Sequence, residues 1–107
     1  MSASRTTIRD EDRLDNVHPG DILREDFRIG SEIPVDEVSA GTGIPVADLR
    51  RLLDRAAAVN AETDLRLGRY FGVSEGFFLG LQDDYDLEEV RRSKAGAEID
   101  RIVPRAA

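Results

Sequence analysis

The sequence has 107 residues, no cysteine and a formal charge of −7 at pH 7. This length suits one domain with a buried core, and the lack of cysteine excludes disulfides and cysteine-ligated metal sites. Residues 1–16 contain no apolar run typical of a signal peptide, and no stretch reaches the ~20 apolar residues of a spanning helix, so we expect a cytoplasmic protein with no membrane partner.

The negative charge is unevenly distributed along the chain. Residues 1–43 and 73–107 are acidic, whereas residues 44–72 carry five basic and four acidic side chains. Affinity for DNA depends on neutralising phosphates, so the central segment permits a nucleic-acid partner. The acidic first third suits a basic protein partner at least as well.

The first helix is predicted to begin near His18. Residues 1–16 before it are polar and without periodicity, which indicates a mobile arm. Pro19 suits the first helical position and Asp21 the electropositive first turn, and the helix is predicted to continue until Gly30 ends it. His18 is the only histidine, and its place at a helix start favours a structural role over a catalytic one.

Two short helices with a tight turn between them follow. The pattern predicts helices over residues 35–42 and 46–55, joined at Gly43-Ile44-Pro45. This is typical of a helix-turn-helix, whose second helix can enter the major groove of DNA and present its first side chains to base edges. Those side chains are here Val46, Ala47 and Asp48.

The remaining elements are also predicted to be helical. Asn60 is a good N-cap for a helix over residues 61–71, which Gly72 ends, and Ser74 is predicted to cap the next helix. That helix carries an aromatic and apolar stripe indicating core or dimer interface: Phe77, Phe78, Leu81 and Tyr85. Gly96 is predicted to interrupt it before a last apolar face that needs cover: Ile99, Ile102 and Val103. Strand signals are too sparse for a sheet, so the predicted class is all-α.

Catalytic chemistry has few candidate residues in this sequence. No nucleophile, base and orienting carboxylate stand out together, and the acidic clusters at residues 10–12 and 83–86 lack the ligand order of a calcium loop. Gly41-Thr42-Gly43 has neither the lysine nor the further glycine of a phosphate loop. We therefore expect no enzyme, no cofactor and no metal site.

Four segments together are more specific than the helix-turn-helix alone. They are His18–Phe27 (HPGDILREDF), the turn at Gly43, Leu65–Gly72 (LRLGRYFG) and Phe77–Leu87 (FFLGLQDDYDL). In this order they closely resemble the HigA family of antitoxins, of the VapI type, over about residues 17–103. The resemblance implies a five-helix, lambda-repressor-like domain with a Cro/repressor-like helix-turn-helix. We expect an arm over residues 1–16, this domain over residues 17–95, and a C-terminal helical extension over residues 96–107 that contacts a dimer mate or partner.

The resemblance also implies a function in two parts. Members are often homodimers that bind the operator of their own operon, and they bind and silence a small HigB toxin of the RelE-like class, which cleaves messenger RNA. We expect the DNA contacts to come from the helix-turn-helix and the next helix start: Pro45, Val46, Ala47, Asp48, Arg50, Arg51, Arg55 and Asn60. A basic toxin could dock on acids of the first helix, Asp21, Glu25 and Asp26, and of the arm, Asp10, Glu11, Asp12 and Asp15. A solvated charged face explains these acids equally well.

The departures from the family pattern fall where DNA would be read. Pro34-Val35 stands where the family usually has Ser and Gln for phosphate contact, and Asp54-Arg55 stands where it usually has Asn-Gly. Residues 46–48, usually polar or basic, are two apolar side chains and an anion. The arginines at 50, 51 and 55 can bind guanine, although those at 51 and 55 also fit a solvated face. An alternative is therefore a protein-binding module with a repressor-like fold that has lost operator reading.

Overall fold

The computed structural model describes residues 15–106, where the regular elements are helices. They are α1 (Pro19–Glu25), α2 (Val35–Thr42), α3 (Val46–Leu53), α4 (Ala61–Phe71), α5 (Phe77–Arg92) and α6 (Lys94–Asp100). Strand pairing in the described residues amounts to one isolated bridge, between Ile29 and Ile33. The predicted all-α class is confirmed. The predicted arm lies outside the described residues except for Asp15 and Asn16.

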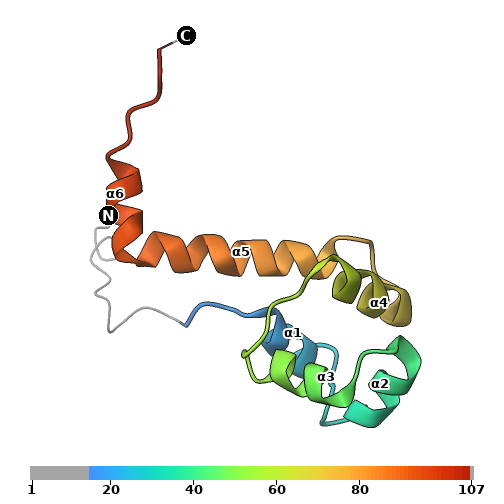
Figure 1. Ribbon diagram of the computed structural model, residues 1–107. Helices are drawn as coiled ribbons and strands as arrows, with labels where there is room; N and C mark the ends of the chain where they lie inside the picture. Colours follow the sequence, from blue (N-terminus) through green and yellow to red (C-terminus); the bar gives the residue numbers. More distant parts are fainter. Residues whose placement is uncertain (1–14, 107) are drawn as a thin grey trace, which may run out of the picture.

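Helices α1 to α4 form a body against which α5 packs (Figure 1). In this body α3 contacts α1 and α2, while α5 contacts α4 and α1. Five helices each contribute a fully buried apolar side chain: Leu23, Val38, Leu49, Leu67 and Phe78. Burying each of them stabilises the fold by about 1.5–3 kcal/mol, so the core also determines which side of α3 faces outward.

The turn between α2 and α3 is closed by side-chain hydrogen bonds. Gly43 has φ +79°, a left-handed conformation that suits glycine. Ser39 Oγ donates to the carbonyl oxygen of Ile44 at 2.6 Å, and Thr42 Oγ1 accepts from Ile44 N at 3.1 Å. From α4, Arg66 donates to the carbonyl oxygen of Thr42 at 2.9 Å. The predicted helix-turn-helix is confirmed, and α4 helps to hold its turn. Its second helix is shorter than predicted, ending at Leu53 and not at residue 55, because Arg55 adopts a left-handed conformation.

The start of α1 is a capping box centred on His18. The Nδ1 atom of His18 accepts from Gly20 N at 2.9 Å, and Asp21 Oδ2 accepts from His18 N at 3.0 Å. Pro19 occupies the first helical position, as predicted. Burial lowers the pKa of His18 below its usual value, and the nearby Asp21 carboxylate opposes this shift. The neutral ring can accept from Gly20 N, in keeping with the structural role predicted for His18.

The prediction that the first helix continues to Gly30 is wrong. Helix α1 ends at Glu25, and Arg28 has the left-handed φ of +63°. Ile29 N then donates to the carbonyl oxygen of Leu23 at 3.1 Å, which turns the chain back over the end of the helix. Ile29 becomes fully buried in this way. Burial of this side chain outweighs the small gain from continuing an exposed helix.

The prediction that Ser74 caps the fifth helix is also wrong, because the cap comes from α4. Asp64 is only 1% exposed. Its Oδ2 accepts from Gly76 N at 2.7 Å, and its Oδ1 accepts from Phe78 N at 2.8 Å and Leu79 N at 3.0 Å. A carboxylate is suited to this position because the first amides of a helix carry partial positive charge. Helix α4 therefore determines where α5 begins.

Gly96 does not interrupt a helix as predicted, since it lies inside α6 and the break falls at Ser93. A Cβ atom at Gly96 would lie 2.3 Å from the carbonyl oxygen of Arg91, so glycine allows α6 to approach the end of α5 closely. Figure 1 shows α6 turned sharply away from the far end of α5. Large apolar side chains stay exposed in this region: Leu87, Val90, Ile99, Ile102 and Val103.

Candidate nucleic-acid interface

Helix α3 presents the front of its first turn to solvent. Its inner side packs into the core through three buried leucines: Leu49, Leu52 and Leu53. Pro45 is the exposed N-cap, and Val46 is half-buried because it packs against the core. Ala47 and Asp48 are exposed. The methyl group of Ala47 and the carboxylate of Asp48 are therefore the exposed side-chain groups in the first turn of α3.

Two arginines follow on the exposed side of α3, and they differ in their partners. Arg51 Nη2 donates to the carbonyl oxygen of Ala56 at 2.9 Å. The guanidinium of Arg50 makes no hydrogen bond or ion pair with another residue of the described chain. It borders a hollow of about 370 Å³ together with Arg24 and Ser31. Of these two guanidinium groups, that of Arg50 is the one available to a ligand without breaking a described contact.

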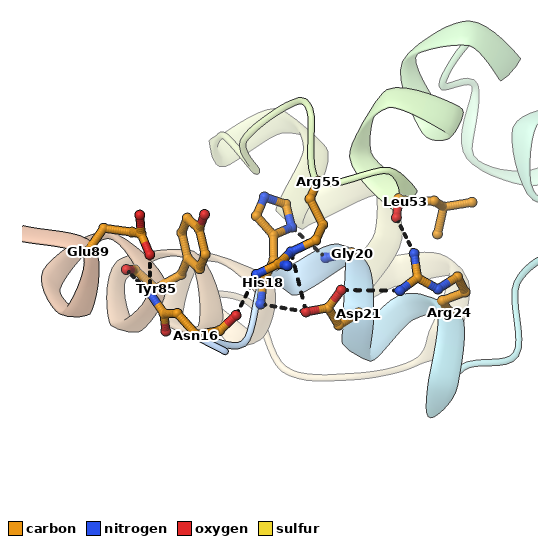
Figure 2. Close-up of polar contacts among 9 residues, drawn as sticks. All are labelled: Asn16, His18, Gly20, Asp21, Arg24, Leu53, Arg55, Tyr85 and Glu89. Carbon is orange, nitrogen blue, oxygen red and sulfur yellow. Dashed lines mark hydrogen bonds and ion pairs between the residues drawn. The ribbon is translucent and has the colours of Figure 1, made fainter. Parts of the chain in front are cut away.

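Arg55 lies just beyond α3 and points toward α1 and α5 (Figure 2). Its Nη2 donates to the carbonyl oxygen of Asn16 at 2.5 Å, and its Nε lies 3.6 Å from Asp21 Oδ2. Its Cζ lies 6.0 Å from the centre of the Tyr85 ring. The DNA contact expected of Arg55 remains a prediction, and it would require the side chain to leave these partners.

The backbone of Arg55 closes α3 in a conformation that favours glycine. Its φ is +64°. Ala56 N donates to the carbonyl oxygen of Arg51 at 2.8 Å, and Arg55 N donates to that of Leu52 at 3.1 Å, the two bonds of a Schellman motif. A residue with a side chain costs roughly 1 kcal/mol in this conformation, which glycine adopts without strain.

Asn60 caps α4 as predicted and places the amide end of that helix beside α3. Its Oδ1 accepts from Thr63 N at 2.8 Å. Between the two helices lies a hollow of about 260 Å³, bordered by Asn60, Thr63, Asp48 and Arg51 among others. Free amides at a helix start and an arginine attract phosphate, whereas the Asp48 carboxylate repels it.

The three acids predicted to contact a toxin differ in accessibility. The Asp21 side chain is 18% exposed and interacts with Arg24 and Arg55. Glu25 and Asp26 are exposed at the end of α1, and neither has a side-chain partner within residues 15–106. The structure therefore places Asp21 in an internal network and the other two at the surface.

Arg24 belongs to the candidate interface although no sequence pattern identified it. Its Nη1 donates to the carbonyl oxygen of Leu53, the last residue of α3, at 2.5 Å, and its Nη2 donates to Asp21 Oδ1 at 3.2 Å (Figure 2). The spacing of Asp21 and Arg24 could have indicated their ion pair. The bond to Leu53 could not be predicted, because it joins residues 29 positions apart.

The comparisons with known proteins give three informative relatives, although no family model matches the chain. An addiction module antidote protein of a HigA family from Coxiella burnetii is 30% identical, with a TM-score of 0.77, covering 86% of this chain and all of that one. Pseudomonas aeruginosa antitoxin HigA, solved with the higBA promoter, is 25% identical, with a TM-score of 0.76 and the same coverage. Virulence-associated protein I of Dichelobacter nodosus is 28% identical over 88 residues, covering 82% of this chain and 80% of that protein.

Fold and site together define the class of the protein, a helix-turn-helix domain of the repressor type with an exposed recognition helix. Among residues 15–106, no cluster of acids and histidine could hold a metal ion, and no helix is long and apolar enough to cross a bilayer. At 30% identity over the whole Coxiella chain, the relationship extends beyond fold. The chain belongs to the HigA family of antitoxins.

Proposed function

We propose that this protein is a non-enzymatic antitoxin that represses its own operon through α3 and silences a small toxin by direct binding. The DNA part rests mainly on the exposed recognition helix, in a fold shared with a HigA structure solved with promoter DNA. The guanidinium of Arg50, which has no partner among the described residues, supports the same conclusion. Both features suit double-stranded DNA read in the major groove.

In this proposal the exposed side chains contribute differently to DNA binding. Arg50 donates to guanine N7 and O6, the most frequent specific contact of arginine in the major groove. Ala47 can contact a thymine methyl, and Asp48 can accept from the cytosine amino group. The amide end of α4 at Asn60 binds phosphate, and Arg51 adds a cation beside it. Pro45 and Val46 shape the front of α3 and donate no hydrogen bond from their side chains.

We also propose that the protein acts as a homodimer. Two copies would place two recognition helices in successive major grooves, about 34 Å apart on an operator with two half-sites. The exposed apolar side chains of α5, α6 and the segment just after α6 support this, because a second copy would remove them from water: Leu87, Val90, Ile99 and Ile102. The C-terminal segment at residues 96–107 contributes to that surface in this proposal.

The toxin part of the proposal concerns a RelE-like HigB toxin that cleaves messenger RNA. A protein that cleaves RNA is expected to be basic, since it must approach a polyanion. Glu25 and Asp26 offer it two exposed carboxylates at the end of α1 that have no partner in residues 15–106. The acids at residues 10–12, also expected to take part, lie outside the described residues.

A second candidate function is a protein-binding module that keeps the repressor fold and no longer reads an operator. It is favoured by the front of α3, where Val46 is drawn toward the core and the exposed Asp48 would face phosphate. It is also favoured by Pro34, which caps α2 without a side-chain hydrogen bond and has no amide to offer a phosphate.

A binding titration distinguishes the two candidates. We expect the wild-type chain to bind DNA from upstream of its own gene more tightly than a scrambled duplex, with two chains per duplex. Arg50→Ala should weaken operator binding about 10- to 100-fold, the range for losing one good arginine contact to guanine. Fluorescence anisotropy at two salt concentrations measures this, and Arg69→Ala, at an exposed position of α4, is the control for loss of one positive charge. Equal binding to both duplexes by the wild-type chain would favour the second candidate.

The docking of the toxin is tested by charge reversal on α1. Glu25→Lys together with Asp26→Lys should slow association with the basic protein encoded beside the gene by about tenfold or more, because steering by opposite charge is lost and reversed. Asp83→Lys with Asp84→Lys makes the same change on exposed positions of α5 and serves as the matched control. Surface plasmon resonance gives the rates, and equal slowing by both pairs would contradict docking at the end of α1.

A further inference from the structure

We propose that Arg55 positions the recognition helix and does not itself read DNA, and that Asp21 is its partner in this role. The inference rests on the proposed operator function and assigns two residues a different part in it. The contacts concerned join the end of α3 to α1 and to the chain before α1, and we call them the Arg55 clip: Arg55, Asp21, Arg24 and Asn16 (Figure 2).

The backbone of Arg55 gives the first reason for this proposal. At φ +64°, this position closes α3 in the left-handed conformation, and both bonds of the Schellman motif are backbone bonds. Glycine would make the same two bonds without strain. The presence of arginine is therefore explained by its side chain, and strained positions of this kind are often functional.

The side chain of Arg55 joins three parts of the chain. It donates to the carbonyl oxygen of Asn16, lies beside the Asp21 carboxylate and approaches the ring of Tyr85. Asn16 is itself held on α5, since its Nδ2 donates to the carbonyl oxygen of Tyr85 at 2.8 Å and to Glu89 Oε2 at 3.1 Å. Through Arg55, the end of α3 is thus connected to α1 and α5 together.

Asp21 connects to the end of α3 by a second route. Its Oδ1 accepts from Arg24, whose other terminal nitrogen donates to the carbonyl oxygen of Leu53. The Asp21 carboxylate is therefore linked to the end of α3 in two ways: through Arg24 to Leu53, and through Arg55 to the turn after the helix. Arg50 lies one turn before this end, so loosening the clip changes where its guanidinium meets the groove. Binding sites depend on side chains held within about 0.5 Å of the productive geometry.

Because Asp21 is an anion, a positioning role and a purely electrostatic role predict opposite changes in DNA affinity when its charge is removed. Removing an anion from a DNA-binding protein should tighten binding, because phosphates are less repelled. If Asp21 positions α3, Asp21→Asn should instead weaken operator binding. The amide oxygen of the new side chain can still accept from His18 N, so the capping box of α1 is preserved.

The test measures operator affinity across a range of salt for Arg55→Gly, Asp21→Asn and the double variant. We expect each single variant to bind the operator about tenfold more weakly than the wild-type chain, which is the usual size of a coupling between packed positions. The double variant should bind no more weakly than either single variant, because both substitutions remove the same interaction. The slope of log affinity against log salt should stay at the wild-type value, because no phosphate contact is lost. Asp83→Asn on α5 is the control for removing one exposed carboxylate, and it should bind at least as tightly as wild type.

Thermal unfolding of two glycine variants supplies a second readout. Arg28 also has a left-handed φ, of +63°, and its ion pair with Glu32 joins two exposed side chains. Arg28→Gly should therefore raise Tm, because strain is relieved and little is lost. Arg55→Gly should not raise Tm, because relief of the same strain is offset by loss of the clip.

Three outcomes would overturn the inference. The first is a salt slope reduced by about one unit in Arg55→Gly, which would identify Arg55 as a direct phosphate contact. The second is wild-type affinity in both single variants, and the third is an equal rise of Tm in Arg28→Gly and Arg55→Gly. Lack of sequence-dependent binding by the wild-type chain itself would instead overturn the operator function, so the two failures are distinguishable.

Discussion

Replacing Asp64 by alanine is expected to lower the free energy of unfolding by about 3 kcal/mol or more, because three backbone amides at the start of α5 lose a charged acceptor. The amide of Phe78 is buried, and water cannot replace the carboxylate there. The substitution also leaves a gap between α4 and α5 where a side chain only 1% exposed now packs. Urea denaturation followed by circular dichroism measures the loss.

Two variants of α4 serve as controls for this prediction. Asp64→Asn keeps one acceptor oxygen of similar size, so its loss should fall between those of wild type and alanine. Glu62→Ala removes a carboxylate whose ion pair with Arg66 is exposed, and it should cost less than about 1 kcal/mol. A loss below about 1 kcal/mol in Asp64→Ala, with an unchanged denaturant slope, would show that α5 does not depend on this cap.

Gly20→Ala is expected to lower the free energy of unfolding by about 3 kcal/mol, because it forces α1 away from α3. A Cβ atom on Gly20 would lie 2.1 Å from the carbonyl oxygen of Leu52, which is backbone and cannot rotate aside. The displacement would also strain the bonds from α1 to the end of α3. Operator affinity should therefore fall in the fraction that remains folded. Urea denaturation and anisotropy on the same preparation measure both effects.

Gly80→Ala is the matched control for Gly20→Ala. Gly80 lies inside α5, and a Cβ atom there would meet no described atom within 4 Å. The same substitution should therefore raise the free energy of unfolding by about 0.5–1 kcal/mol, the helix-propensity difference between the two residues. Equal losses in the two variants would contradict a specific close approach of α1 to α3.

The parts of the fold that could be predicted from the sequence are those with local causes. Pro19 and Asn60 begin helices because of their own backbone and side-chain chemistry, and Gly43 and Gly72 end helices because they adopt left-handed backbone conformations. The spacing of the apolar residues was sufficient to predict which side of α3 packs into the core. Each of these signals acts within about one helical turn, which is the range that periodicity and capping describe.

The features that could not be predicted depend on where elements cross. The cap of α5 comes from Asp64, which is 12 positions from Gly76, and Arg55 meets Asn16 across 39 positions. In both cases the sequence shows a charged side chain with several possible partners, and tertiary packing selects one. For the same reason, the sequence identified Arg50, Arg51 and Arg55 as candidates but could not show which of them have side-chain partners. In the structure, Arg51 and Arg55 have such partners among the described residues.

The cap that Asp64 provides has a consequence for how this family can diverge. Because α5 receives its cap from α4, the residues around its start are not required to supply one. Ser74 and Glu75 are exposed, and Phe77 is 41% exposed. Substitutions of Ser74 and Glu75 are therefore expected to leave the bonds that begin α5 intact, whereas the Phe77 ring also packs against those of Phe27 and Phe78. That part of the surface can therefore change without altering the start of α5, provided that the carboxylate of Asp64 is kept.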